Sequence, residues 1–215
     1  MATCGCCRKS PPAFSVERKG NMGKVIFDIT ASLDGFVTGP NASPDLPMGE
    51  GGLRLFDWYF SAPETTRAGE FIDEDIREQA VQTVGAIVSG RRTYDHAKGW
   101  NGQHPLGVPV FVVTHHPPED DVTLNGAFVT DGVESAIRQA QAAAGDKAVA
   151  VASPNIMQQG LKAGLVDELS LHFVPVLLGG GVRLFDALGI EPVELECTQI
   201  THTPKVIHMT FRVIK

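Results

Sequence analysis

The chain has 215 residues, 43% of them hydrophobic and 20% charged, which is enough to bury one sizeable core in a single domain. Its formal net charge of -7 argues against nucleic acid as a partner, because binding to a phosphate backbone requires a basic face. No apolar run approaches the roughly 20 residues of a membrane span and no apolar secretory signal begins the chain, so we expect a cytoplasmic protein without a membrane partner.

The first residues differ in character from the rest of the chain. Residues 1–22 carry Pro11-Pro12, several charges and no hydrophobic periodicity, so we predict a disordered N-terminal extension followed by one domain over residues 23–215. Three of the four cysteines fall within this extension and Cys197 stands alone, which is typical of a reducing compartment. A soft-metal site at the clustered cysteines is the alternative, but no second Cys or His pair lies nearby, so we expect no metal.

The domain begins with alternating, β-branched residues. Residues 25–30 predict a strand, and residues 32–37 predict a turn into a second short extended piece. Asp34 then lies where the first strand ends, either at the mouth of a cleft or as ordinary Asp-Gly turn chemistry. Residues 39–52 are rich in proline and glycine, and this long loop is a candidate substrate lid. A short helix is expected over residues 53–60.

A helix and a buried strand follow. Residues 74–84 predict a helix with one apolar face, formed by Ile76, Ala80, Val81 and Val84. The apolar run 84–88 predicts a strand that ends in a tight turn at Gly90. Thr93 is the predicted N-cap of the next helix.

Two arginines, Arg91 and Arg92, lie on that turn. A helix N-terminus carries free amide donors and a partial positive charge, so a turn with two guanidinium groups suits phosphate oxygens. A solvated basic turn is the alternative interpretation. Residues 94–108 predict a loop in which Trp100 is either the wall of a cleft or a surface plug.

A polar turn ends the next strand. Residues 108–113 predict that strand. Thr114, His115 and His116 follow it, either as hydrogen-bond donors to a phosphate or as a solvated turn. Adjacent histidines on a strand point to opposite faces, so we do not expect these two to share a metal.

The second half alternates strands and helices. Strands are predicted over residues 127–130 and 148–151, and residues 131–134 resemble a capping box. The helix after that box has an apolar stripe formed by Val133, Ala136, Ile137, Ala140 and Ala144. Ser153 is the predicted cap of the next helix, with Pro154 in its first turn.

The chain closes with three further strands. Residues 169–174 predict one strand, and residues 195–201 and 206–213 predict a C-terminal antiparallel hairpin. Strands that alternate with helices imply parallel pairing, so we predict an α/β fold with a mixed, mainly parallel sheet flanked by helices. Ligands in such folds collect at the carboxyl ends of the strands.

Several motifs together resemble one family. Residues 90–95 are similar to the Gly-Arg-x-Thr-aromatic-acid signature of the dihydrofolate reductase superfamily. Segments 32–35, 164–171 and 175–181 resemble the branch related to the C-terminal reductase domain of the bifunctional riboflavin-biosynthesis protein. The resemblance implies a dihydrofolate reductase-like three-layer fold, a homodimer, and hydride transfer from NADPH to a small heterocyclic or carbonyl-like substrate.

The resemblance also implies roles for individual residues. Asp34 or Asp57 is expected to supply the proton that accompanies hydride transfer, and Glu50 is a further candidate. The cofactor is expected to contact Ala31, Gly90, Arg91, Arg92, Thr93, Thr114, His115, His116, Ser153, Pro154, Asn155 and Ile156.

Two positions depart from the family pattern. Val151 stands where riboflavin-pathway members carry an acid, and Ser153 stands where a glycine precedes the helix. The lost acid argues against a ribosylamino-pyrimidine substrate, and the added Cβ crowds the place where phosphate approaches the backbone. A catalytically silent nucleotide-binding protein is therefore the first alternative function. A riboflavin-pathway pyrimidine reductase or a folate reductase is the second.

Overall fold

The structure is a computed structural model, and it describes residues 23–60, 72–119, 123–186 and 188–215. The predicted N-terminal extension, with its cysteine cluster, lies outside the described residues. Within the described ranges, no helix has the length and apolar character needed to cross a membrane.

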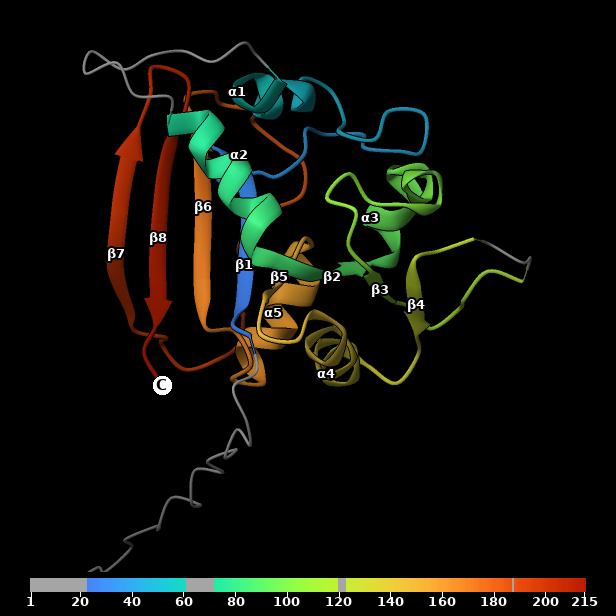
Figure 1. The fold of residues 1–215 in the computed structure, drawn as a ribbon. Helices are drawn as coiled ribbons and strands as arrows, with labels where there is room; N and C mark the ends of the chain where they lie inside the picture. The colour runs from blue at the N-terminus through green and yellow to red at the C-terminus, as the bar shows by residue number, and fades with distance from the viewer. Residues whose placement is uncertain (1–22, 61–71, 120–122, 187) are drawn as a thin grey trace, which may run out of the picture.

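The core of the fold is one mixed sheet of eight strands (Figure 1). Their spatial order is β4-β3-β2-β5-β1-β6-β8-β7, and the strands from β4 to β6 pair in parallel. The strands are β1 (Val25–Ser32), β2 (Val84–Gly90), β3 (Val110–Val113), β4 (Gly126–Val129), β5 (Ala148–Val151), β6 (Glu168–Val174), β7 (Leu195–His202) and β8 (Ile207–Val213). The last two form an antiparallel hairpin whose β8 pairs antiparallel with β6. The predicted fold class is confirmed.

Helices lie in most of the connections between parallel strands, and among the described residues none lies between β3 and β4. They are α1 (Asp57–Phe60), α2 (Ile72–Thr83), α3 (Arg91–His96), α4 (Val133–Ala144) and α5 (Pro154–Lys162), with short 3-10 segments at η1 (Gly52–Phe56) and η2 (Lys98–Gly102). In the view of Figure 1, α2 passes in front of β8, β6 and β1, and α4 and α5 lie below it.

Each face of the sheet has its own hydrophobic cluster. The largest cluster joins alternate side chains of the central strands, such as Phe27 and Val88, to Ile137 on α4 and Met157 on α5. On β2, the neighbouring Ile87 belongs to a second cluster, with Tyr94 of α3. Burying each such large side chain stabilises the fold by about 1.5–3 kcal/mol. The two clusters fix β2 in place and thereby fix the turn at its end.

Several local predictions differ from the structure. Thr93 is not an N-cap, because Gly90 is extended (φ −86°, ψ 155°) and α3 already begins at Arg91. The predicted capping box is also absent: Gly132 is the N-cap of α4, without a side-chain hydrogen bond. The predicted apolar face before β2 is wrong in part, because Val81 is 55% exposed and Val84 belongs to the strand.

The segment after α3 is a tight structure rather than the predicted loop. Lys98, Gly99, Trp100 and Asn101 all have positive φ, between 49° and 60°. A left-handed backbone costs a residue other than glycine about 1–2 kcal/mol. Strain of this kind persists where the surrounding contacts impose it, and it is frequent at functional sites.

Candidate functional site

A pocket of about 820 Å³ opens at the carboxyl ends of β2, β3 and β5, and we refer to it as the larger pocket. The ends of parallel strands meet at one edge of a sheet, and this edge is where ligands bind in such folds. Eleven of the twelve predicted cofactor residues line it: Gly90, Arg91, Arg92, Thr93, Thr114, His115, His116, Ser153, Pro154, Asn155 and Ile156. Segments far apart in the sequence are therefore brought together as expected.

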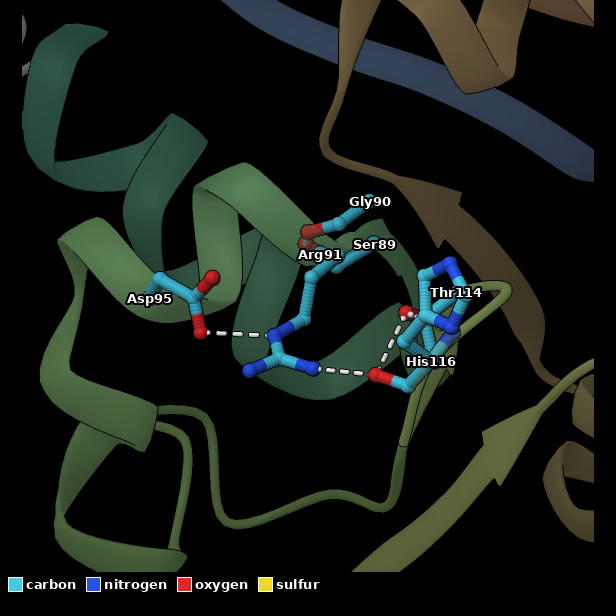
Figure 2. Close-up of polar contacts among 6 residues, drawn as sticks. All are labelled: Ser89, Gly90, Arg91, Asp95, Thr114 and His116. Atoms are coloured by element: carbon cyan, nitrogen blue, oxygen red, sulfur yellow. Dashed lines mark hydrogen bonds and ion pairs between the residues drawn. The ribbon is translucent and has the colours of Figure 1, made fainter. Parts of the chain in front are cut away.

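Arg91 lines the larger pocket, and its side chain forms hydrogen bonds with Asp95 and His116 (Figure 2). Its Nε donates to Asp95 Oδ1 at 2.7 Å within α3, and its Nη1 donates to the carbonyl oxygen of His116. The Thr114 hydroxyl also donates to that carbonyl, at 3.1 Å, and accepts the N–H of His116 at 3.1 Å. The guanidinium thus joins the start of α3 to the turn that follows β3.

Arg92 differs from Arg91 in its environment. It is exposed, and no described residue forms a hydrogen bond or ion pair with its guanidinium. Arg183 also lines the larger pocket, with its guanidinium carbon 4.9 Å from the centre of the Phe36 ring. Three arginines and one acid, Asp186, therefore line this pocket in a chain whose net charge is -7. The pocket is suited to an anion.

Ser153 joins the two turns that face the larger pocket. Its Oγ accepts the N–H of Gly90 at 2.9 Å and lies 2.8 Å from Thr93 Oγ1 and 3.4 Å from Ser89 Oγ. Ser153 is the N-cap residue of α5, as predicted, but its buried side chain makes no capping hydrogen bond to the helix. Its hydroxyl instead ties the end of β2 to the start of α5.

The first turn of α5 presents backbone donors to the larger pocket. Its first helical hydrogen bond runs from Met157 N–H to the Ser153 carbonyl. The N–H groups of Asn155 and Ile156 precede this bond, and both residues line the pocket. Pro154 at the first position has no N–H to satisfy. Such N–H groups at a helix start bind phosphate oxygens.

A second pocket of about 290 Å³ adjoins the first, and we refer to it as the smaller pocket. The two share four lining residues: Arg92, Thr93, Pro154 and Val182. The smaller pocket lies between β1, the 39–52 loop, α3 and the left-handed turn at η2. We refer to the two adjoining pockets together as the groove, which is charged in the larger pocket and largely apolar in the smaller one.

Trp100 forms a wall of the smaller pocket. Its ring lies edge-on to Tyr94, with 6.0 Å between ring centres, and to His104, with 5.0 Å. Its backbone is left-handed (φ 49°), and strain of this kind is frequent at functional sites. Of the two interpretations of Trp100, the structure supports the cleft wall.

His96 also lines the smaller pocket, and sequence reasoning missed it. Its Nδ1 lies 3.1 Å from the carbonyl oxygen of Pro47. The spacing on α3 was the available signal. His96 follows Thr93 by three residues and Arg92 by four, and positions so spaced share one helix face. Met48, in the predicted lid loop, is another missed lining residue.

Asp34 lies outside both pockets and has a structural environment. Its carboxylate accepts hydrogen bonds from the Ser32 hydroxyl (2.6 Å), Leu178 N–H (3.1 Å) and Gly179 N–H (2.7 Å). The bond from Ser32, together with the backbone bonds, outweighs partial desolvation and lowers the pKa of Asp34 below its usual 3.8. A carboxylate held in this way is a poor proton donor at neutral pH.

The other predicted acids also lie away from the smaller pocket. Asp57 is exposed at the start of α1, and Glu50 is exposed and accepts a hydrogen bond from the Asn41 side chain at 2.8 Å. Ala31, the twelfth predicted cofactor residue, is 1% exposed in the core, while Ile29 and Thr30 line the smaller pocket. Among the described residues, no group of three or more His, Cys, Asp or Glu side chains is placed to hold a metal ion.

Comparisons with known proteins show the family and the fold of the chain. A sequence model of the RibD C-terminal domain matches residues 23–209. The uncharacterized protein YwjB of Bacillus subtilis is 23% identical over 168 residues, which cover 77% of this chain and 84% of YwjB.

Two solved structures share the fold at low sequence identity. A putative riboflavin biosynthesis protein from Shewanella sp. PV-4 is 23% identical with a TM-score of 0.60, covering 90% of this chain and 100% of that one. Dihydrofolate reductase from Enterococcus faecalis, in complex with NADP(H) and RAB-propyl, is 12% identical with a TM-score of 0.54, covering 91% and 98%. With a match over most of its length and a reductase-type fold around the groove, the chain belongs to the RibD C-terminal domain family.

Proposed function

We propose that the protein is an NADPH-dependent reductase that transfers a hydride from the nicotinamide to a small heterocyclic or carbonyl-like substrate. One observation carries the proposal: a pocket lined by three arginines adjoins a largely apolar pocket at the carboxyl ends of parallel strands. The charged pocket suits the phosphates of a dinucleotide, and the apolar pocket suits a small substrate beside it. The solved dihydrofolate reductase complexed with NADP(H) has the same fold.

The larger pocket is proposed to hold the phosphates of the cofactor. The N–H groups of Asn155 and Ile156 and the unpaired guanidinium of Arg92 supply donors for the pyrophosphate. The turn at Thr114, His115 and His116 is proposed to contact the 2′-phosphate of the adenosine. Because NADH lacks that phosphate, this turn predicts a preference for NADPH.

The chain's own residues orient the reaction. When bound, NADPH supplies a hydride, which is chemistry that no amino-acid side chain provides. Arg92, Thr93 and Pro154 line both pockets and therefore stand at the point where the nicotinamide meets the substrate. Met48 and Trp100 exclude water from the smaller pocket.

Two copies are proposed to associate through β7. This strand is at the edge of the sheet, and nearly all of its residues are exposed, with Ile200 59% exposed and Leu195 41% exposed. An exposed, partly apolar edge strand favours pairing with another chain.

The alternative of a silent nucleotide-binding protein has one observation in its favour. Neither Asp34 nor Asp57 lines the groove, and no carboxylate occurs among the described residues that line the smaller pocket, so none stands there to supply a proton. Under this alternative NADPH binds tightly, and no substrate oxidises it.

Titration of the wild-type protein with NADPH and with NADH tests the proposal. Quenching of tryptophan fluorescence reports binding, since Trp100 lines the groove. We expect NADPH to bind at least about tenfold more tightly than NADH, which corresponds to about 1.4 kcal/mol for the extra phosphate contacts. Equal and millimolar binding of both would contradict the proposal.

A further inference from the structure

We propose that His96 orients the substrate in the smaller pocket and donates the proton that accompanies hydride transfer, and that the substrate is a small carbonyl compound. This inference rests on the proposed reductase function. It replaces the acids expected from the sequence with a residue that lines the groove.

The hydrogen bond of His96 fixes which ring nitrogen is available. A carbonyl oxygen only accepts hydrogen bonds, so Nδ1, 3.1 Å from the Pro47 oxygen, carries the hydrogen. Nε2 is then the nitrogen left for a ligand, and no described residue bonds to it. The Nδ1–H bond persists whether or not Nε2 is protonated. The ring can therefore gain and release a proton at Nε2 without losing its anchor.

The polar groups of the smaller pocket can all donate hydrogen bonds. They are Thr30, Thr38, Arg92, Thr93 and His96. Thr38 Oγ1 already accepts the N–H of Val182 at 3.2 Å, which leaves its proton for a ligand. A ligand that satisfies these donors must present acceptor lone pairs, and a carbonyl oxygen presents two.

The absence of acids selects against another class of substrate. No carboxylate occurs among the described residues that line the smaller pocket. An amidine-like ring edge, such as that of a pterin, donates hydrogen bonds, and a carboxylate is the strong, charged acceptor for such an edge. The threonine hydroxyls of this pocket offer only neutral acceptors, whose hydrogen bonds are about half as strong.

The size of the smaller pocket limits the substrate further. Its volume of about 290 Å³ suits a compound of about one ring. The apolar walls, which include Ile29, Val37 and Phe56, contact the body of such a compound. His96 contacts its oxygen.

The proposed step moves a hydride to the carbonyl carbon and a proton to the carbonyl oxygen. The carbonyl carbon gains a hydride, with its two electrons, from the dihydronicotinamide, and the π pair of the C=O bond moves to oxygen. His96 gives that oxygen a proton as its Nε2–H bond breaks. The products are an alcohol, NADP⁺ and a neutral imidazole, which regains its proton from water.

Two substitutions separate proton donation from structure. His96→Asn keeps a donor near the position of Nδ1 for the Pro47 carbonyl and removes Nε2. His96→Gln places an amide N–H near Nε2 but has no acidic proton to give. With NADPH and 4-nitrobenzaldehyde as the probe, we expect kcat to fall about 10²–10⁴-fold in both variants. The KM for the aldehyde should rise in the Asn variant and stay near wild type in the Gln variant.

A spectroscopic readout is independent of turnover. In protein labelled with ¹⁵N-histidine, 4-nitrobenzaldehyde should shift the His96 Nε2 resonance, identified by its loss in His96→Asn. Unchanged kcat in both variants, or no shift at saturating aldehyde, overturns the role of His96. Suppose that the wild-type protein binds NADPH but reduces dihydrofolate and not 4-nitrobenzaldehyde, or reduces neither compound. Either outcome overturns the assignment of a carbonyl substrate, and the proposed cofactor site would still stand. Failure to bind NADPH overturns the proposed function itself.

Discussion

Ser153 Oγ accepts the backbone N–H of Gly90 at 2.9 Å, so one buried hydroxyl holds the end of β2 against the start of α5. The family pattern places a glycine at position 153, and the sequence suggests that a Cβ there crowds a phosphate. The structure shows the side chain turned instead toward the β2 turn, where it also lies 2.8 Å from the Thr93 hydroxyl. The serine therefore organises the groove.

Ser153→Ala is predicted to loosen this connection. The partly buried Gly90 N–H would lose its partner, which costs at most about 1–3 kcal/mol. We expect a lower free energy of unfolding in urea by that amount and weaker NADPH binding. Ser135→Ala, which removes an exposed hydroxyl on α4, is the matched control and should change stability by less than about 0.5 kcal/mol. A Ser153→Ala protein as stable as wild type would contradict this role.

Asp34→Asn is predicted to destabilise the 177–180 loop. The carboxylate accepts three hydrogen bonds, which an amide with one acceptor oxygen cannot replace. The bond from Ser32 contributes most to lowering the pKa of Asp34 below 3.8. Because the folded-state pKa is the lower one, the stabilisation is present above pH 3.8 and is lost as the pH falls through the lowered value.

The measurement for Asp34 is the difference in Tm between wild type and Asp34→Asn across pH. We expect wild type to melt at a higher temperature at pH 7 and the difference to shrink at pH 3 and below. A difference that is constant over this range would show that the ionised carboxylate is not responsible.

His104 is predicted to make stability depend on pH between about 4 and 6.5. Burial lowers the pKa of His104 from 6.5 to about 4, and its Nδ1 accepts the Leu106 N–H at 3.2 Å as a neutral imidazole. The unfolded chain binds a proton below pH 6.5 that the folded chain does not bind until about pH 4, so stability falls as the pH falls through this range.

Urea unfolding at several pH values checks the role of His104. His104→Gln should flatten the dependence between pH 4 and 6.5. Identical pH profiles for wild type and His104→Gln would refute the assignment.

Association through β7 is predicted to give a dimer at micromolar concentration. Light scattering should report twice the mass of one chain. Ile200→Lys, which places a charge on the exposed edge strand, should shift the mass toward that of one chain. A wild-type protein that scatters as a monomer removes the proposal, and groove binding of NADPH would be unaffected.

Much of the fold follows from local patterns. The apolar run that ends at Gly90 and the stripe from Val133 to Ala144 predict β2 and α4 because burial on one side imposes a period on the sequence. The exact starts of helices were harder to predict. Thr93 and the residues around Glu134 have the composition of caps, but Gly90 and Gly132 take those positions. The Thr93 hydroxyl, for example, makes a tertiary contact with Ser153 and is not used to cap α3.

The candidate site was predictable only at its charged end. Arg91, Arg92 and the residues at 114–116 follow strand ends, and parallel pairing brings such ends together. The smaller pocket instead combines Met48, His96 and Trp100 from a loop, a helix and a left-handed turn. No sequence spacing links these three segments, and the left-handed turn has no reliable signature when its residues are not all glycine.

The binding of NADPH to Arg92→Ala, compared with Arg138→Ala, tests the central claim most directly. Arg92 lines both pockets, while Arg138 is exposed on α4 and pairs with Glu134 at 3.5 Å, so the two variants remove equal charge at different places. We expect Arg92→Ala to weaken NADPH binding by about tenfold or more through the loss of charge-assisted hydrogen bonds, and Arg138→Ala to bind as wild type does. Equal affinity of all three proteins for NADPH would contradict the placement of the cofactor in this groove.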